Sequence, residues 1–176
     1  KAPMDELIEQ TKLVLDGKKV KSKNFTKQIA FNAIPHIDLF SDDGYTKEEL
    51  KMTNETKKIL GSDINLTATC VRLPISVSHS ESVNIKFKKS FTVDKVKDAL
   101  DNFEGCKVID KRVDGGYSTP LDAEGKNETF ISRIRHDKTI ENGLNLWIVS
   151  DNLLRGAALN SVEIAETLIK ENFYGK

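Results

Sequence analysis

Apolar residues recur at helical spacing in four stretches of the chain, and residues that start or stop helices bound each stretch. Thr46 and Glu49 form a T-x-x-E capping box at the start of the second stretch, and Thr92 is an N-cap residue for the third. Gly175 closes the last. The predicted helices cover residues 5–16, 46–60, 92–103 and 152–173. The predicted inward-facing residues of the first are Leu7, Ile8, Val14 and Leu15.

Strand-like stretches alternate irregularly with these helices. Residues 65–76 are rich in β-branched side chains, and residues 77–88 alternate strictly between an apolar and a polar face. Because there is no strict β-α-β alternation, the pattern predicts an α+β fold: a mixed sheet with helices on one face. No GxGxxG lies between a strand and a helix, so the chain has no dinucleotide cradle of its own. The remaining predicted strands are residues 107–113, 130–135 and 144–149.

The amino-acid composition argues against several classes of function. Lys plus Arg equals Asp plus Glu, so the formal net charge is zero, which argues against a nucleic-acid partner or an acidic membrane surface. No apolar run is long enough to span a membrane. The two cysteines, Cys70 and Cys106, form no CxxC pair, so no metal site is predicted, and their number suits the cytoplasm. A start at Lys1 rather than at a methionine hints at an excised piece.

His79 interrupts the apolar face of the predicted 77–88 strand, between Val77 and Val83. Histidine titrates near neutral pH, which makes it the usual general acid or base in catalysis. The alternative is a structural histidine whose ring nitrogens are satisfied by hydrogen bonds in the core. The strand pattern by itself favours that alternative.

Arg72 shares a predicted strand face with Cys70 and other small or apolar residues. Burying an unpaired guanidinium is costly, so Arg72 needs an anion there. This anion could be an internal carboxylate, or a substrate carboxylate held by two parallel hydrogen bonds. Glu48 and Lys51 form an i, i+3 pair on the first turn of the 46–60 helix, and the pattern alone indicates a surface ion pair.

Five segments, taken together, resemble the C-terminal domain of the aspartate-β-semialdehyde dehydrogenase family. The combination Arg-x-Pro-x(4)-His-Ser, which begins at Arg72, is more specific than any single match, and the resemblance covers nearly the whole chain in order. The segments are residues 31–38 (FNAIPHID), 48–60 (EELKMTNETKKIL), 69–74 (TCVRLP), 78–82 (SHSES) and 151–166, which opens with DNLLRGAA.

The resemblance implies a fold and an activity. The fold is that of the C-terminal domain of glyceraldehyde-3-phosphate dehydrogenase, with residues 1–150 as catalytic and dimerisation domain. Residues 151–176 would form a helix that belongs with an absent NADP-binding half. Full-length members reduce β-aspartyl phosphate with NADPH to aspartate β-semialdehyde and phosphate, toward lysine (through diaminopimelate), methionine and threonine. They are expected to be cytoplasmic homodimers.

The resemblance also implies roles for particular residues. His79 matches the acid/base histidine, and Arg72 the arginine that binds the substrate α-carboxylate. Glu48 matches the glutamate that holds the α-amino group, and Lys51 the lysine that helps to bind phosphate. Asn152 falls where the last helix meets the nicotinamide of NADP. The nucleophilic cysteine and most of the cofactor site would precede Lys1, so the chain alone is predicted to be inactive.

Two other functions stay open at this point. The first is a sister enzyme such as an N-acetylglutamyl-phosphate reductase, against which Glu48 argues, because an acetylated amine has no positive charge to pair. The second is a non-catalytic dimerisation relative, against which the presence of both His79 and Arg72 argues.

Overall fold

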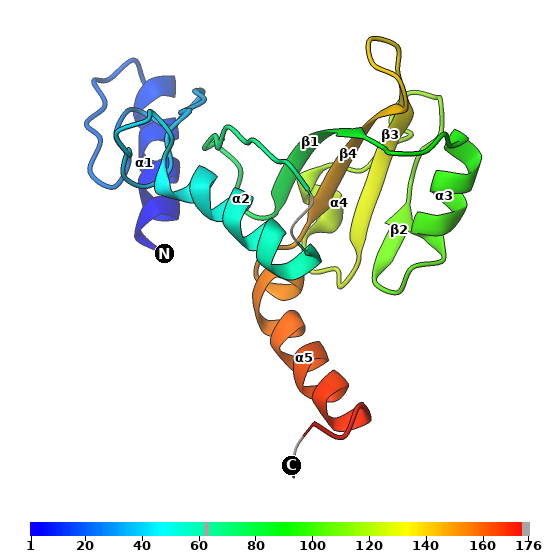
Figure 1. Ribbon diagram of the computed structural model, residues 1–176. Coiled ribbons are helices and arrows are strands. Elements are labelled where there is room, and N and C mark those ends of the chain that lie inside the picture. Colours follow the sequence, from blue (N-terminus) through cyan, green and yellow to red (C-terminus); the bar gives the residue numbers. More distant parts are fainter. Residues whose placement is uncertain (62–63, 174–176) are drawn as a thin grey trace. The chain divides into compact units, whose positions relative to one another are not determined.

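The computed structural model describes residues 1–61 and 64–173, and the chain divides into two compact units, Lys1–Ser76 and Val77–Lys176 (Figure 1). Each unit is held together by its own internal contacts. The domain boundary expected between residues 150 and 151 stays a prediction. Gly175, which was predicted to end the last helix, lies outside the described residues.

The second unit is built on a four-stranded mixed sheet in the order β1-β4-β3-β2 (Figure 1). β4 pairs antiparallel with β1 and with β3, whereas β2 pairs parallel with β3. The strands are β1 (His79–Lys86), β2 (Cys106–Val108), β3 (Thr129–Asp137) and β4 (Gly143–Ser150). The predicted mixed sheet is confirmed, although β2 is shorter than the predicted strand 107–113.

One face of this sheet packs against α3 (Val93–Asp101), which begins at the predicted cap Thr92. Buried Ile131 and Leu144 form the centre of the core there, and Val96 and Leu100 of the helix lie against them. The short helix α4 (Pro120–Ala123) lies on the opposite face, where Ala123 packs on the β3–β4 pair Phe130 and Val149.

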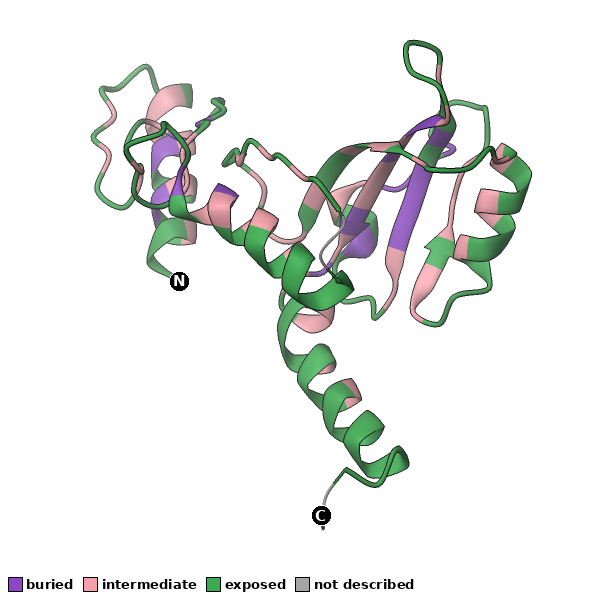
Figure 2. Cartoon of the chain, in the orientation of Figure 1, coloured by how far each residue is buried: buried purple, intermediate pink, exposed green. Residues whose placement is uncertain are grey.

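The chain leaves β4 through η1 (Leu154–Ala158), a π-helical turn, and continues as α5 (Leu159–Lys170). The predicted last helix is therefore present, but it starts with a wider turn. Most of α5 is exposed (Figure 2), including the apolar side chains of Val162, Ile164 and Ile169. None of the helices among residues 1–61 and 64–173 is both long and apolar enough to cross a membrane.

The first unit holds α1 (Ala2–Leu15) and α2 (Lys47–Leu60), joined by a long irregular segment. The predicted inward face of α1 is wrong in part. Leu7 and Val14 are half-buried, but Ile8 is 51% and Leu15 is 74% exposed, whereas Glu6 and Gln10 are buried. The reason is that residues 23–30 fold over the helix, and their backbone N–H groups need acceptors.

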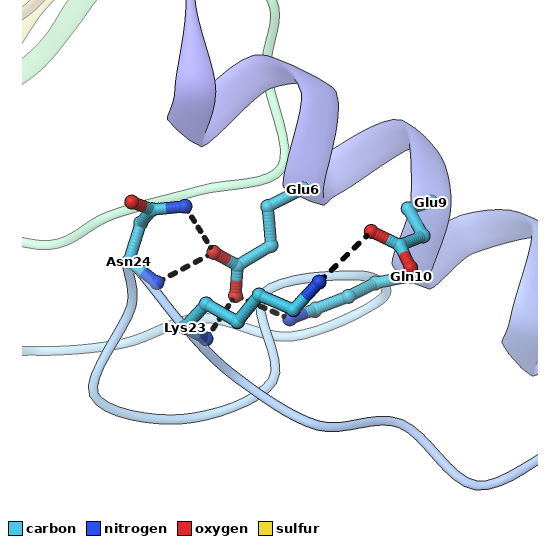
Figure 3. Close-up of polar contacts among 5 residues, drawn as sticks. All are labelled: Glu6, Glu9, Gln10, Lys23 and Asn24. Carbon is cyan, nitrogen blue, oxygen red and sulfur yellow. Dashed lines mark hydrogen bonds and ion pairs between the residues drawn. The ribbon is translucent and has the colours of Figure 1, made fainter.

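These two polar side chains supply the acceptors (Figure 3). The Glu6 carboxylate accepts the backbone N–H groups of Lys23 at 2.8 Å and Asn24 at 2.6 Å. Gln10 donates its amide to Glu6 at 2.8 Å, and its oxygen accepts the N–H of Ile29 at 2.9 Å. The segment is thus pinned to α1 by hydrogen bonds rather than by apolar packing.

The predicted strand over residues 65–76 is wrong. In place of a strand, the described part of this segment forms an isolated antiparallel bridge between Ile34 and Arg72. β-branched composition alone does not make a strand, because a strand also needs a partner of comparable length. The predicted capping box is confirmed: Glu49 N–H donates to Thr46 Oγ1, and Thr46 N–H donates to Glu49 Oε2.

Candidate functional site

His79 is the first residue of β1 and pairs in register with Ser150 at the end of β4. It lies on the same strand face as Val83 and Ile85, which pack against the core, but it sits beyond that core and is exposed. The expectation that His79 interrupts a buried face is therefore wrong. Because His79 is exposed, its ring nitrogens do not need hydrogen-bond partners inside the core.

Ser78, which precedes His79, has an unusual backbone. Its φ is +77°, a left-handed value that side-chain-bearing residues rarely adopt. Its N–H donates to Asn152 Oδ1 at 2.8 Å, and its Oγ donates to the carbonyl of Pro120 at 3.0 Å. Ser78 therefore links Asn152 to His79: it is hydrogen-bonded to Asn152 and directly precedes His79 in the chain. All three residues lie in the second unit.

Asp151 fixes the turn from which Asn152 projects. Its buried carboxylate accepts N–H groups of Gly125 and Leu153, each at 2.8 Å, and of Leu154 at 3.3 Å. These hydrogen bonds, that from Gly125 foremost, outweigh burial and hold the pKa of the Asp151 carboxyl below its ordinary value. The carboxylate therefore stays charged at neutral pH and acts as a rigid anchor.

The first turn of α2 carries Glu48 and Lys51. Glu48 Oε1 lies 3.7 Å from Lys51 Nζ, and both side chains are solvent-accessible. This is the surface ion pair that the sequence pattern indicates. It also presents one negative and one positive group side by side, the combination that a zwitterionic, phosphorylated ligand would require.

Glu49 connects this turn to the segment that carries Arg72. Besides closing the capping box, its Oε1 accepts the N–H of Cys70 at 2.9 Å. Hydrogen bonds from Thr46 and Cys70 outweigh burial and lower the pKa of the Glu49 carboxyl. Two residues further on, the Arg72 backbone exchanges hydrogen bonds of 2.8 and 2.9 Å with Ile34.

The Arg72 side chain itself is exposed, so the expectation of a guanidinium on an apolar strand face is wrong. None of the described side chains pairs with it. Arg72, Glu48 and Lys51 belong to the first unit, whereas His79 and Asn152 belong to the second. The structure thus positions the predicted residues as two groups.

Cys106 has the chemistry of a structural thiol. Burial raises the pKa of the Cys106 thiol, and the charge of Arg155 opposes the shift only in part. A thiol that stays protonated is a poor nucleophile. Within residues 1–61 and 64–173, no three His, Cys, Asp or Glu residues are grouped so as to hold a metal ion.

Residues 1–155 match the model of one protein family, whose description is "semialdehyde dehydrogenase, dimerisation domain". The chain belongs to this family. An aspartate-semialdehyde dehydrogenase of Bacillus subtilis (strain 168) is 49% identical over 176 residues, which are 95% of this chain and 51% of that protein. The chain spans about half the length of the curated relatives it matches.

Solved structures of the semialdehyde dehydrogenase family confirm the fold class. Aspartate semialdehyde dehydrogenase II from Vibrio cholerae, described as complexed with ASA, has a TM-score of 0.91 and 41% identity, over 97% of this chain and 50% of that one. The Candida albicans aspartate semialdehyde dehydrogenase with NADP has a TM-score of 0.68 and 25% identity, over 82% of this chain and 46% of that one.

Three residues that organise this family domain were missed by sequence reasoning: Glu6, Gln10 and Asp151. The i, i+4 spacing of Glu6 and Gln10 places them on one helix face, which was a signal, but polar helix faces usually point to solvent. Asp151 directly follows a strand and precedes a helix, where Asp is a typical N-cap residue. For Glu49 the capping box was visible, but its bond to Cys70, 21 residues away, was not.

Proposed function

We propose that this chain supplies the acid–base and substrate-binding residues of an enzyme that reduces β-aspartyl phosphate to aspartate β-semialdehyde, with release of phosphate. The observation that carries the proposal is the exposed imidazole of His79 at the start of β1. A histidine kept only for core hydrogen bonding would be buried, whereas an exposed one can reach a substrate. The relatives named aspartate-semialdehyde dehydrogenase support this assignment.

In the proposed reaction, a thiolate attacks the acyl carbon, expels phosphate and forms a thioester, which hydride then reduces. Cys106 is disfavoured as the nucleophile, because burial raises its pKa and keeps the thiol protonated. Cys70 does not match the position of the nucleophile that the family resemblance implies, so the nucleophile would come from outside this chain. His79 would accept the thiol proton at an imidazole nitrogen. It would give that proton to the oxygen of the thiohemiacetal formed by hydride transfer. It would take the proton back as the C–S bond breaks, which releases the aldehyde and regenerates the thiolate.

Charged side chains of the first unit would orient the substrate. Arg72 would bind the α-carboxylate through the two-pronged geometry of its guanidinium. Glu48 would pair with the α-ammonium, and Lys51 with phosphate, so that their mutual ion pair opens when substrate binds. A sister enzyme with an acetylated substrate is disfavoured, because it would leave Glu48 without a cationic partner.

NADP, the proposed cofactor, supplies the hydride when bound. The residue of this chain that would contact the nicotinamide is Asn152. Its Oδ1 is occupied by Ser78, whereas no described residue accepts from its Nδ2, and an amide donor fits the nicotinamide carboxamide. A nucleotide cradle is absent from the sequence, so most of the cofactor would be held by residues outside this chain.

The family description supports a further proposal, that the domain forms a homodimer. A cytoplasmic location also stays a prediction.

The test is a pair of histidine substitutions in the full-length enzyme that carries this chain. His79→Ala should lower kcat by about 10²–10⁴-fold with little change in the KM for aspartate semialdehyde. His136→Ala is the matched control, because His136 is also exposed, packs only on Phe91 among aromatic rings of the described residues, and should leave kcat unchanged. Wild-type kcat for His79→Ala, together with a lower melting temperature, would restore the structural-histidine interpretation.

A further inference from the structure

We infer that Asn152 is a positioning residue for His79, and that it acts through the backbone of Ser78. The inference rests on the proposed function of His79 and adds a role for Asn152 beyond contact with the cofactor. All the groups involved lie in the second unit, between the end of β4 and the start of β1.

The conformation of Ser78 sets the direction in which His79 enters the sheet. A left-handed φ of +77° is unfavourable for any residue with a Cβ, so neighbouring contacts must hold it. Two hydrogen bonds do so: the Ser78 N–H donates to Asn152 Oδ1, and the Ser78 Oγ donates to the Pro120 carbonyl. Only the first of them acts on the backbone of Ser78 directly.

The acceptor on Asn152 is itself held in place. β4 ends at Ser150, the in-register partner of His79, so Asn152 follows the paired strand after one residue. That one residue is Asp151, whose buried carboxylate accepts three backbone N–H groups. Its carbonyl also accepts the N–H groups of Leu154 and Arg155. A side chain fixed at this turn can hold a strained neighbour.

Arg155 braces the same turn from the helix side. Its Nε donates to the carbonyl of Asn127 at 3.0 Å, and its guanidinium pairs with Glu163 of α5. On Asn152 itself, Oδ1 accepts the hydrogen bond from Ser78, and the Nδ2 amide group is left to donate to a ligand. The side chain proposed to meet the nicotinamide is the same one that orients the acid–base histidine.

The experiment is a double-mutant cycle between Ser78→Gly and Asn152→Ala in the full-length enzyme. Glycine adopts φ +77° without strain, so it should no longer need the Asn152 hydrogen bond. With Ser78 present, Asn152→Ala should lower kcat by about tenfold, the value of one lost hydrogen bond in a rate. In the Ser78→Gly background, the loss of kcat on adding Asn152→Ala should be at least about fivefold smaller than in the wild-type background, and the remaining loss belongs to the cofactor contact of Asn152.

The second readout is independent of catalysis. Amide exchange of peptides that contain residues 78–82 is measured in the cofactor-free enzyme. Asn152→Ala should speed this exchange about fivefold to tenfold, and Asn152→Asp, which keeps an acceptor oxygen, should hold it near the wild-type rate.

The inference would be overturned if Asn152→Ala lowered kcat equally in the wild-type enzyme and in the Ser78→Gly variant. It would also be overturned if Asn152→Ala left the amide exchange of residues 78–82 unchanged. A rise confined to the KM for NADPH would mean that Asn152 serves the cofactor alone. Failure of the proposed function would look different. In that case His79→Ala would keep its kcat, while Asn152→Ala would still speed exchange at residues 78–82.

Discussion

Replacing Glu6 by glutamine tests whether a buried carboxylate, rather than apolar packing, holds the segment that follows α1 (Figure 3). Glu6 is 4% exposed. One of its oxygens accepts from Lys23 N and Gln10 Nε2, and the other accepts from Asn24 N and Asn24 Nδ2. A glutamine has one oxygen and one NH₂ group, so in either orientation it turns a donor toward two donors.

The expected magnitude follows from those two lost acceptor contacts. A hydrogen bond to a charged group contributes about 1.5–3 kcal/mol, and two of them would give about 3–6 kcal/mol. Lys23 and Asn24 are exposed residues, so water can replace part of this loss. We expect Glu6→Gln to destabilise the attachment of residues 23–24 by about 2 kcal/mol, which is roughly thirtyfold in an opening equilibrium.

Glu9→Gln is the matched control on the same helix. Glu9 is exposed and lies 3.6 Å from Lys23 Nζ, a surface ion pair that should contribute at most about 0.5 kcal/mol. The assay is amide exchange at Lys23 and Asn24, followed residue by residue by NMR. Glu6→Gln should speed exchange at both amides about thirtyfold and Glu9→Gln less than about threefold. Similar effects of the two variants would refute the proposed anchor.

Acid provides a second readout of the same carboxylate. Burial raises the pKa of Glu6, but hydrogen bonds from Lys23, Asn24 and Phe25 outweigh it, and the net pKa lies below the ordinary value of 4.5. A folded-state pKa below the unfolded one stabilises the fold above pH 4.5, and this stability is lost as the pH falls through the folded-state value. Exchange at Lys23 and Asn24, corrected for its intrinsic pH dependence, should rise in that window. Glu6→Gln should abolish the rise.

Four further predictions concern the remaining parts of the chain. Gly105→Ala should destabilise the second unit by about 2 kcal/mol in urea unfolding, because φ is +79° and a Cβ would clash with the Arg155 guanidinium group, which Asn127 and Glu163 hold in place; Gly17→Ala, at φ +67° with nothing within 4 Å, is the control and should cost about 1 kcal/mol or less. In the full-length enzyme, Arg72→Lys should raise the KM for aspartate semialdehyde at least about tenfold, because the charge stays but the two-pronged contact is lost, and an unchanged KM would remove Arg72 from the substrate site. The 176-residue chain alone should show no NADP-dependent turnover of aspartate semialdehyde, since neither a nucleophile nor a nucleotide cradle is assigned in it, and measurable turnover would contradict this. Amides of α5 should exchange faster than those of β1, because the apolar side chains of this helix are largely exposed, and equal protection would mean that another surface covers the helix.

Features that depend on neighbours in the sequence could be predicted. The Thr46–Glu49 capping box and the Thr92 cap each depend on two residues three positions apart, and such a pair can be recognised directly in the sequence. The alternation that predicted the 77–88 strand reflects a period of two, and β1 occupies its centre. The mixed sheet followed from the order of such elements, and the candidate residues His79, Arg72 and Asn152 were found by motif.

Only the tertiary structure decided which side chains are buried and what they bind. His79 and Arg72 looked buried by periodicity and are exposed, because a strand face is covered only where another element lies on it, and residues 65–71 have no strand partner among the described residues. Glu6 looked like a solvated helix residue and is buried, because a loop 17 residues away folds over it and brings unsatisfied N–H groups. The bond from Ser78 to Asn152 spans 74 residues. Such long-range pairings are set by the packing of the whole unit, so no local pattern in the sequence could have indicated them.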